Sequence, residues 1–281
     1  MSLEIKPFVK WVGGKRQIIS EIEKRLPKKI NCYYEPFVGG GALFMHLQNP
    51  KTVINDYSED LINVYKQIKD YPLELMKNLD EYEIGHANIE NFYYDIRKMD
   101  RDDSWINAEQ IIKATRFIYL NKACFNGLYR VNKQGYFNVP SNGKKTIKTY
   151  EKDNLMNLSK FLNKSGIKIV SGDFEVACKN AKKGDFIFFD PPYDLLNKSS
   201  FDSYTKDSFG VEGQKRLANL FKKLDKKGCY VMLTNHNTEL INELYNEYNI
   251  DVIKVRRAIN SDGSKRTGEE TIIYNYDLED M

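Results

Sequence analysis

Short apolar segments alternate with helical patterns along most of the chain, and this alternation restricts the possible folds more than any other feature. Seven segments have the length and composition of strands: Tyr33–Phe37, Thr52–Asn55, Ile167–Ser171, Phe186–Phe189, Cys229–Thr234, Ile250–Val255 and Thr271–Tyr274. Apolar residues at helical spacing lie between several of them, for instance over 18–26 and 217–224. Strands that alternate with helices predict an α/β fold with a mostly parallel sheet.

Residues 58 to about 125 interrupt this alternation with a mainly helical segment. One apolar stripe there has helical spacing: Leu61, Val64, Tyr65 and Ile68. Further along, Asn107 is followed three residues later by Gln110, a spacing that predicts the start of another helix at Asn107.

A β-hairpin is predicted over residues 125–140, because turn residues at 132–135 separate two aromatic-rich arms. With 281 residues, the chain can form one large core and a smaller appended unit. We therefore expect an α/β domain made of residues 1–57 and 150–281. Residues 58–149 would be an insertion of helices and the hairpin.

Positive charge is concentrated in one part of the sequence. No acidic residue lies between Glu109 and Glu151, and that interval contains eight basic residues: Lys113, Arg116, Lys122, Arg130, Lys133, Lys144, Lys145 and Lys148. The net charge of the whole chain is +4, so the remainder carries 4 − 8, or −4. Such a segment suits a polyanion, and Arg130 could bind the edge of a guanine from the predicted hairpin. A solvated basic face and a purely structural hairpin are the alternatives.

A glycine turn between a strand and a helical segment points to a ligand. In the sequence YYEPFVGGGALF, Gly39 and Gly41 allow a ligand to approach the backbone, and the following helix offers unpaired N–H groups. One strand later, VIND ends in Asp56, whose carboxylate can accept hydrogen bonds from both hydroxyls of a ribose. Together these features indicate a cofactor that contains adenosine.

Two common nucleotide-binding motifs do not match. A dinucleotide site would need glycine or alanine where the chain has Phe44, and a phosphate-binding loop would need serine or threonine where it has Arg16. By elimination, the cofactor is a mononucleoside without phosphates, a description that S-adenosylmethionine fits.

The segment FIFFDPPY indicates a reaction for such a donor. An adenine amine is a poor nucleophile because its lone pair is delocalised into the ring. If Asp190 and the Pro191 carbonyl each accept one N–H, the lone pair can point at a sulfonium methyl group. Pro192 helps to fix the turn, and stacking of the base on Tyr193 is worth ~1–3 kcal/mol. The alternative is an ordinary strand end followed by a proline turn.

The composition predicts a soluble protein of the cytoplasm. No apolar stretch is long enough to span a bilayer, and residues 1–10 lack the apolar core of a signal peptide. The four cysteines have no paired spacing and there are three histidines, so we expect no disulfide framework and no metal site.

Four motifs, in this order, resemble the Dam-type DNA adenine-N6 methyltransferases, the alpha group of the D12 class. They are KWVGGK at 10–15, EPFVGGG at 35–41, NGLYR at 126–130 with FNVP at 137–140, and DPPY at 190–193. The resemblance covers nearly the whole chain. It implies a Rossmann-like S-adenosylmethionine-dependent methyltransferase fold with a helical plus β-hairpin DNA-recognition insertion.

The resemblance also implies roles for individual residues. Catalysis would involve Asp190, Pro191, Pro192 and Tyr193. Cofactor contacts would come from Trp11, Lys15, Glu35, Phe37, Gly39, Gly41, Asp56, Asp173, Phe174 and Asp190. Contacts with DNA would come from Lys10, Asn126, Leu128, Arg130, Asn138 and Pro140. Without the resemblance, Lys15 could be a surface lysine and Asp173 a cap at a strand end.

The usual target of that family is GATC in double-stranded DNA, and the target adenine would have to leave the duplex. Tyr129 and residues 141–143 depart from familiar members, which leaves the flanking-base preference open. We expect a lid over residues 194–210, with Phe201 and Tyr204 as stacking groups. We also expect a monomer, which acts in DNA replication or beside a restriction endonuclease that it does not bind.

Three alternatives use related chemistry or a related surface. A cytosine-N4 methyltransferase is disfavoured by Asp190, since serine would be expected before the two prolines. An RNA or protein-amide methyltransferase would more often have asparagine at that position. A non-catalytic DNA-binding protein is disfavoured by the intact cofactor motifs.

Overall fold

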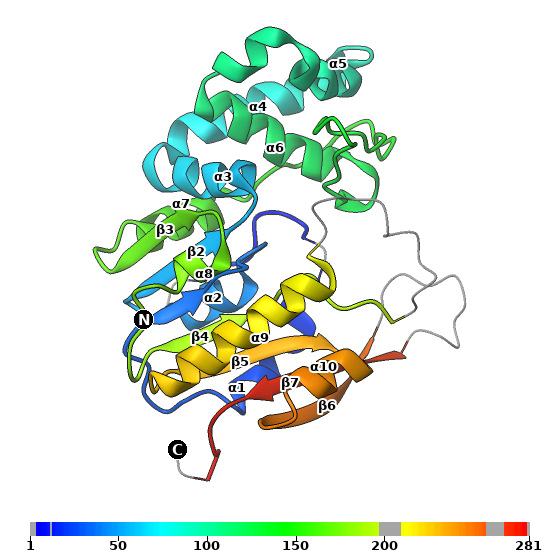
Figure 1. The fold of residues 1–281 in the computed structure, drawn as a ribbon. Helices are drawn as coiled ribbons and strands as arrows, with labels where there is room; N and C mark the ends of the chain where they lie inside the picture. Colours follow the sequence, from blue (N-terminus) through cyan, green and yellow to red (C-terminus); the bar gives the residue numbers. More distant parts are fainter. Residues whose placement is uncertain (1–3, 12, 197–208, 257–266, 280–281) are drawn as a thin grey trace. The chain divides into compact units, whose positions relative to one another are not determined.

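The computed structural model describes residues 4–11, 13–196, 209–256 and 267–279 (Figure 1). Backbone proximity divides the chain into two compact units. Unit 1 consists of Met1–Gly14, Gly39–Gln48 and Asp56–Ser171, and unit 2 consists of Lys15–Val38, Asn49–Asn55 and Gly172–Met281. These units follow backbone contacts and not function, so the expected division into a catalytic domain and a recognition insertion stays a prediction. The expected lid, with Phe201 and Tyr204, lies largely outside the described residues.

The strands form a seven-stranded sheet in the order β3-β2-β1-β4-β5-β7-β6. Their bounds are β1 Tyr33–Glu35, β2 Thr52–Asp56, β3 Ile167–Ser171, β4 Phe186–Phe189, β5 Tyr230–His236, β6 Asn249–Arg256 and β7 Thr267–Tyr274. β1 pairs in parallel with β2 and β4, and β4 with β5, whereas β7 is antiparallel to β5 and β6. All seven predicted strands and the mostly parallel sheet are confirmed, and the fold is the Rossmann-like α/β class that was expected.

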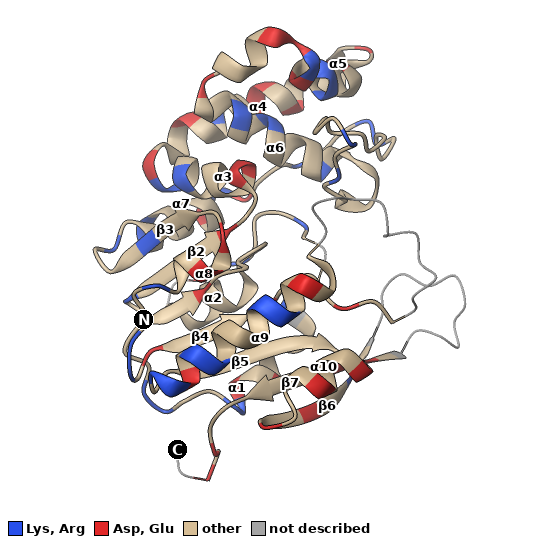
Figure 2. Cartoon of the chain, viewed as in Figure 1, with Lys and Arg blue, Asp and Glu red and all other residues tan. Residues whose placement is uncertain are grey.

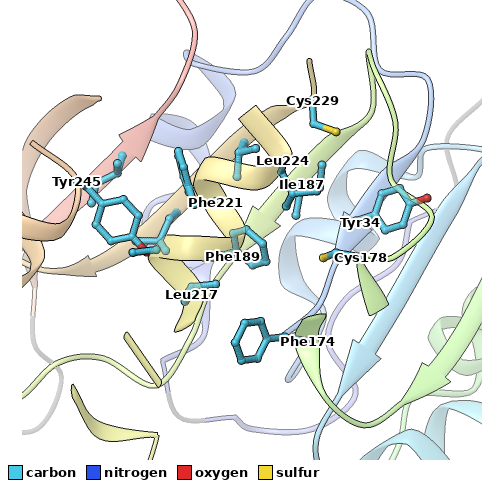
Figure 3. Close-up of a cluster of buried hydrophobic side chains, with 14 of the residues drawn as sticks. Tyr34, Phe174, Cys178, Ile187, Phe189, Leu217, Phe221, Leu224, Cys229 and Tyr245 are labelled. Carbon is cyan, nitrogen blue, oxygen red and sulfur yellow. The ribbon is translucent and has the colours of Figure 1, made fainter. Parts of the chain in front are cut away.

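Unit 2 buries the central strands under apolar helix faces. Its helices are η1 Lys15–Gln17, α1 Ile19–Glu23, α8 Phe174–Ala177, α9 Gly210–Lys226 and α10 Glu239–Leu244. All four residues of β4 are fully buried, as expected for a parallel strand covered on both faces. Leu217, Phe221 and Leu224 of α9 belong to the same buried cluster as Ile187 and Phe189 of β4 (Figure 3).

Unit 1 is mainly helical. Its helices are α2 Ala42–Leu47, α3 Glu59–Asp70, α4 Pro72–Asn88, α5 Phe92–Lys98, η2 Met99–Arg101, η3 Asp103–Asn107, α6 Gln110–Ala123, η4 Phe125–Gly127 and α7 Lys152–Leu162. α3 begins after Ser58, whose hydroxyl accepts a hydrogen bond from the Leu61 N–H. The predicted apolar stripe of this helix is confirmed, because all four of its residues are at most 1% exposed.

The prediction that Asn107 begins a helix is wrong. Asn107 is the last residue of η3, which is capped at its other end by Asp102, whose carboxylate accepts from the Ser104 N–H at 2.8 Å. α6 instead begins after Glu109, whose side chain makes no capping hydrogen bond. Asn107 thus belongs to the preceding turn, and the apparent capping spacing is not used.

The predicted hairpin is present only as a short pairing without regular strands. Val131 and Phe137 form one antiparallel bridge, and the Asn132 side chain closes the turn by accepting from the backbone of Gln134 and Tyr136. The two arms are also joined by hydrogen bonds from the Asn132 N–H to the Tyr136 carbonyl and from the Asn138 N–H to the Arg130 carbonyl. These flank the Val131–Phe137 bridge, so the Phe137 N–H points away from the other arm, and it donates to Asp100. The arms are thus paired by isolated bridges and not by the predicted strands.

None of the helices among the described residues is long and apolar enough to cross a membrane. Basic residues occur in the segment that follows α6, whereas α3, α4 and α9 carry both signs of charge (Figure 2).

Candidate active site

The predicted catalytic turn, residues 190–193, begins where β4 ends. Phe189 of β4 pairs with Leu233 of β5, so Asp190 and Thr234 are the next residues on two neighbouring parallel strands. The Thr234 hydroxyl donates to Oδ1 of Asp190 at 3.1 Å. The carboxyl ends of parallel strands thus bring together two polar groups that are far apart in the sequence.

Lys15 forms an ion pair with Asp190, with 2.7 Å between Nζ and Oδ1. The Lys15 side chain is 7% exposed and that of Asp190 is 19% exposed. Burial raises the pKa of Asp190 above its usual range, and the charge of Lys15 and the hydroxyl of Thr234 oppose that rise. The alternative of a surface lysine is therefore wrong, since Lys15 is buried against Asp190.

The two oxygens of the Asp190 carboxylate differ in their surroundings. Lys15 and Thr234 both contact Oδ1, and within the described parts of the chain no hydrogen-bond or ion-pair partner reaches Oδ2. Nor does any described donor reach the carbonyl oxygen of Pro191. One oxygen of the acid is anchored, and its second oxygen and a neighbouring main-chain oxygen can still accept.

Tyr193 is held from three directions in unit 2. Its hydroxyl donates to Oε2 of Glu270 at 2.9 Å, and its ring lies 4.9 Å from the ring of His236 between centroids. The ammonium of Lys15 lies over the ring, 4.6 Å from its centroid. Burial, together with Asp190 and Glu270, raises the pKa of Tyr193 well above its usual range, so the phenol stays neutral. The ring is therefore held in one orientation by neighbouring side chains.

Sequence reasoning missed several residues that contact the catalytic turn: Gln214, Thr234, Asn235, His236 and Glu270. A signal existed for three of them, because TNH follows the apolar run YVML at the end of β5 in the same way that Asp190 follows FIFF. Gln214 is a polar residue on the buried face of α9, three residues before Leu217. A buried polar side chain needs a partner, and this could have marked it.

Two predicted cofactor residues of unit 2 are aromatic. The rings of Phe37 and Phe174 stack with centroids 5.2 Å apart, and both contact Phe209. Glu35 is 3% exposed and accepts from the hydroxyl of Tyr33 at 2.7 Å. The structure thus brings Phe37 and Phe174 together.

Asp173 is both a cap and an ion-pair partner. Its Oδ1 accepts from the Glu175 N–H at 2.8 Å, so Asp173 is a cap, and the element it caps is the start of α8. Its Oδ2 lies 2.8 Å from Arg216, whose guanidinium is also 5.0 Å from the ring of Phe174.

The predicted cofactor residues of unit 1 surround the glycine turn. The N–H of Gly39 donates to Oδ2 of Asp56 at 3.0 Å, while the N–H of Ser58 donates to Oδ1 at the same distance. Gly39 and Gly41 have φ values of 47° and 71°, which disfavour any other residue. A Cβ on Gly39 would lie 2.6 Å from Cδ1 of Trp11, so the indole packs directly on the turn. Burial raises the pKa of Asp56, and the backbone N–H groups oppose that rise.

Trp11 also belongs to an aromatic stack. Its ring is 6.1 Å from Phe117 and 6.2 Å from Tyr129, and the last two rings are 4.2 Å apart. The Tyr129 hydroxyl donates to Asp60 at 3.2 Å. Tyr129, where the chain departs from familiar members of the resembled family, is therefore a packing residue.

The predicted DNA residue Lys10 lies beside the turn at Gly127. The Asn121 side chain accepts from the Lys10 N–H at 2.9 Å and donates to the carbonyl oxygens of Lys10 and Gly127 at 2.8 and 3.0 Å. A Cβ on Gly127 would lie 2.4 Å from Cδ of Lys10. Asn121, which is fully buried and which sequence reasoning missed, thus joins the first and third motifs.

The remaining predicted DNA residues lie in the loop formed by residues 125–140. Arg130 is exposed, and its Nε donates to Oδ1 of Asn138 at 2.9 Å. Asn126 has a left-handed backbone with φ 56° and, like Pro140, is exposed, whereas Leu128 is half-buried. The structure therefore presents polar side chains to solvent along this loop.

Asp100 holds the same loop in place, a role that could not be predicted from the sequence. Its Oδ2 accepts from the Phe137 N–H at 2.7 Å and lies 2.7 Å from the buried Arg116. The Arg101 guanidinium donates to the Phe137 carbonyl at 2.9 Å. Arg116, counted above as part of the basic segment, is therefore a structural residue.

Comparison with known proteins identifies the family. The family model for the D12 class N6 adenine-specific DNA methyltransferase matches residues 11–259. The Type II methyltransferase M1.LlaDCHI of Lactococcus lactis subsp. cremoris is 44% identical over 276 residues, which cover 98% of this chain and 96% of that protein.

Two further relatives are similar over almost their whole length. The Type II methyltransferase M.MjaIII of Methanocaldococcus jannaschii is 42% identical and is matched over 98% of this chain and 100% of its own. The DNA adenine methylase of Haemophilus influenzae is 33% identical, with 96% and 93% covered.

An α/β fold whose fourth strand ends in an acid and two prolines, with a family match over most of its length, is that of a methyltransferase. The chain belongs to the D12 class of N6 adenine-specific DNA methyltransferases. Membership implies DNA as the substrate and S-adenosylmethionine as the methyl donor. It favours adenine-N6 transfer over the cytosine-N4, RNA, protein-amide and non-catalytic alternatives.

Proposed function

We propose that this protein methylates the N6 amine of an adenine that has been extruded from duplex DNA, within the sequence GATC. The observation that carries the chemical part is the asymmetric Asp190 carboxylate: Oδ1 is bound by Lys15 and Thr234, and no described residue makes a hydrogen bond or ion pair with Oδ2. The resemblance of residues 126–140 to the Dam-type recognition segment supports the target sequence.

Asp190 and Pro191 would orient the target amine. Oδ2 of Asp190 accepts one amine N–H and the Pro191 carbonyl accepts the other, which directs the nitrogen lone pair away from both acceptors. S-adenosylmethionine supplies an electrophilic methyl group, which leaves the sulfur as a thioether is formed and becomes bonded to the amine nitrogen. The proton that the nitrogen then loses is accepted by Asp190 and passes to water. Orientation of this kind, with preorganised acceptors, accounts for most of the rate enhancement.

Tyr193 would bind the extruded base. Its ring is fixed by Glu270, His236 and Lys15, so little conformational freedom would be lost when a base stacks on it. Stacking of ~1–3 kcal/mol would offset part of the few kcal/mol that extrusion of the base costs.

The residues present fit S-adenosylmethionine. In unit 1, the Asp56 carboxylate is half-buried beside the left-handed Gly39 turn, an arrangement suited to ribose hydroxyls. In unit 2, the Phe37 and Phe174 rings offer apolar contact for a purine, and Asp173 offers a carboxylate beside it. Trp11, Lys15, Glu35 and Gly41 complete the proposed cofactor set. Arg216 holds Asp173, so the cofactor would share this acid with a guanidinium group.

DNA would be bound by the exposed side chains of unit 1. Arg130 can read guanine, and Asn138 holds its Nε in place. Lys10, Asn126, Leu128 and Pro140 would contact the duplex around it. The eight basic residues between Glu109 and Glu151 include Arg116, which is buried, so seven at most remain for the polyanion.

One assay tests donor, acceptor and target together. The pure protein is incubated with methyl-labelled S-adenosylmethionine and plasmid DNA, and modified bases are mapped. We expect N6-methyladenine in GATC. Methylation of adenine in another sequence would refute the target, and no methylated adenine would refute the function. Increased fluorescence of 2-aminopurine at the target position would support extrusion of the base.

We further propose a monomer that acts in the cytoplasm, in replication or as the modifying partner of a restriction endonuclease. The Type II names of two relatives support the second role. Plasmid DNA methylated by the protein should resist an endonuclease that cuts the mapped site, and light scattering should report the mass of one chain, 32.8 kDa.

A further inference from the structure

Two buried amides connect β5 and α9 to the catalytic turn of unit 2. Gln214 is 1% exposed and Asn235 is fully buried. Nε2 of Gln214 donates to the Pro192 carbonyl at 2.8 Å, and Nδ2 of Asn235 donates to Oε1 of Gln214 at 3.1 Å. Oδ1 of Asn235 accepts from the N–H groups of Asp194 and His236, both at 2.9 Å.

This chain of hydrogen bonds has one direction only. Two backbone N–H groups point at the Asn235 side chain, so the atom that receives them must be its oxygen. Its nitrogen therefore faces Gln214, which must present its oxygen to Asn235 and its nitrogen to Pro192. Each group can act only as the donor or only as the acceptor. This relay of hydrogen bonds, from Asp194 through Asn235 and Gln214 to Pro192, therefore fixes the Pro192 carbonyl in one position.

The turn needs support of this kind because of its two prolines. Neither Pro191 nor Pro192 has a backbone N–H, so the turn cannot be held by donors of its own at these positions. The next donor along the chain, the Asp194 N–H, is bound by Asn235 as well. The peptide between Pro191 and Pro192 contains the carbonyl that we propose as the second acceptor for the target amine.

We infer that Gln214 and Asn235 are positioning residues that set the direction of the Pro191 carbonyl for methyl transfer. The inference rests on the proposed function, in which Asp190 and Pro191 are the two acceptors. Neither amide touches the reacting atoms. They act through the Pro192 carbonyl, whose displacement would rotate the adjoining peptide and misalign the amine.

Two substitutions at Gln214 distinguish a positioning role of this side chain from a role in packing alone. Gln214→Met has a similar volume and removes both hydrogen bonds. Gln214→Glu keeps the acceptor for Asn235 and loses only the donor to Pro192. We expect kcat to fall by about 10²-fold in both, since small displacements of aligned groups have effects of that size. KM for S-adenosylmethionine and for DNA should change by less than about threefold. Lys222→Met, an exposed change on the same helix, is the control and should keep the wild-type kcat.

The direction of the relay has its own test. Asn235→Asp keeps the acceptor for Asp194 and His236 but removes the donor to Gln214, so the Gln214 amide turns its oxygen towards Pro192. We expect a loss of kcat similar to that of Gln214→Glu. A double-mutant cycle combines Gln214→Met with Asn235→Asp. We expect kcat of the double variant to be less than about threefold below that of Asn235→Asp, because that change already breaks the hydrogen bond from Asn235 to Gln214.

Several outcomes would overturn the inference. One is a kcat within about twofold of wild type for both Gln214 variants. Another is a change in KM without a change in kcat. A third is a double variant in which the kcat losses of Gln214→Met and Asn235→Asp multiply, as they would for independent residues. A lower Tm with an unchanged kcat would show a purely structural role and count equally against it. If Gln214→Met does not fold, Gln214→Glu and Asn235→Asp decide by the same criteria. Asp190→Ala is measured in parallel: an unchanged rate there would refute the proposed function, whereas a large loss there with normal Gln214 variants would refute only this inference.

Discussion

The proposed catalytic turn of unit 2, residues 190–193, and the proposed DNA-recognition loop of unit 1, residues 125–140, are built in opposite ways. In the turn, polar atoms are bound by buried side chains, among them Lys15, Gln214 and Asn235. In the loop, the buried side chains are apolar, those of Phe137 and Val139, whereas Arg130 faces solvent. The reaction needs acceptors that are already oriented in a site with little water, but recognition needs donors whose partner arrives with the DNA.

This comparison predicts that substitutions in the turn change the rate of methyl transfer, whereas substitutions in the loop change which DNA is used. The largest effect should come from Asp190→Ala, which removes an acceptor and leaves Lys15 without its ion-pair partner. We expect kcat to fall by about 10³-fold or more. Single-turnover methylation measures this, with calorimetry to verify that S-adenosylmethionine and DNA still bind. A rate near that of wild type would remove the basis of the proposed mechanism.

Lys15→Met should have the next largest effect, about 10²-fold on kcat near pH 7. The reaction needs the carboxylate form of Asp190, so the rate falls as the pH drops through the pKa of that group. Burial raises this pKa and Lys15 opposes the rise, so loss of Lys15 should raise the pKa further and move the acidic limb of the kcat profile to higher pH.

A pH series of kcat for wild type and Lys15→Met measures that shift. Lys15→Arg keeps the positive charge and is the control, for which the acidic limb should stay close to that of wild type. If the limb of Lys15→Met does not move, the ion pair does not control the charge of Asp190.

Arg130→Ala should affect discrimination between DNA sequences and leave kcat on the best site nearly unchanged. The loss of a guanine contact costs ~1–3 kcal/mol of discrimination, or about 5- to 150-fold. Because Arg130 is exposed, Tm should not change. The measurement is kcat/KM on duplexes with and without the mapped guanine. Lys133→Ala in the same loop is the control. It should weaken the binding of all DNA sequences to the same extent, and the size of this effect should depend on the salt concentration. Unchanged discrimination in Arg130→Ala would show that this residue does not read the sequence.

The smallest effect is expected for Asn138→Ala, which releases the Nε of Arg130. A hydrogen bond of this kind contributes about 1 kcal/mol, so discrimination should fall by about fivefold. The same change in the Arg130→Ala background should have no further effect, as measured by kcat/KM on the same duplexes. An equal loss in both backgrounds would mean that Asn138 contacts DNA by itself.

Much of the fold could be predicted because local patterns agreed with it. The apolar run of β4 and the stripe of α3 are strong signals, and each element formed where it was expected. The errors fell where short local patterns were weak. Asn107 ended η3 instead of capping α6, and residues 125–140 formed isolated bridges instead of regular strands.

The candidate site was predictable to a similar degree. DPPY and the glycine turn could be recognised because proline and glycine restrict the backbone locally. The partners of Asp190 could not, because Lys15 and Thr234 lie on other elements and reach it only when the sheet has formed. Trp11 was expected to contact the cofactor, and its packing on Gly39, Phe117 and Tyr129 was not foreseen.

The sequence by itself determined the strands, the helical segment and the position of the acid before two prolines, because backbone preferences and apolar periodicity act over a few residues. Only the tertiary structure decided which oxygen of Asp190 is bound, that Lys15 is its buried partner, and that Gln214 and Asn235 hold the turn. Those contacts join residues that are remote along the chain, and a hydrogen bond depends on distances of a few tenths of an ångström, which no local pattern specifies.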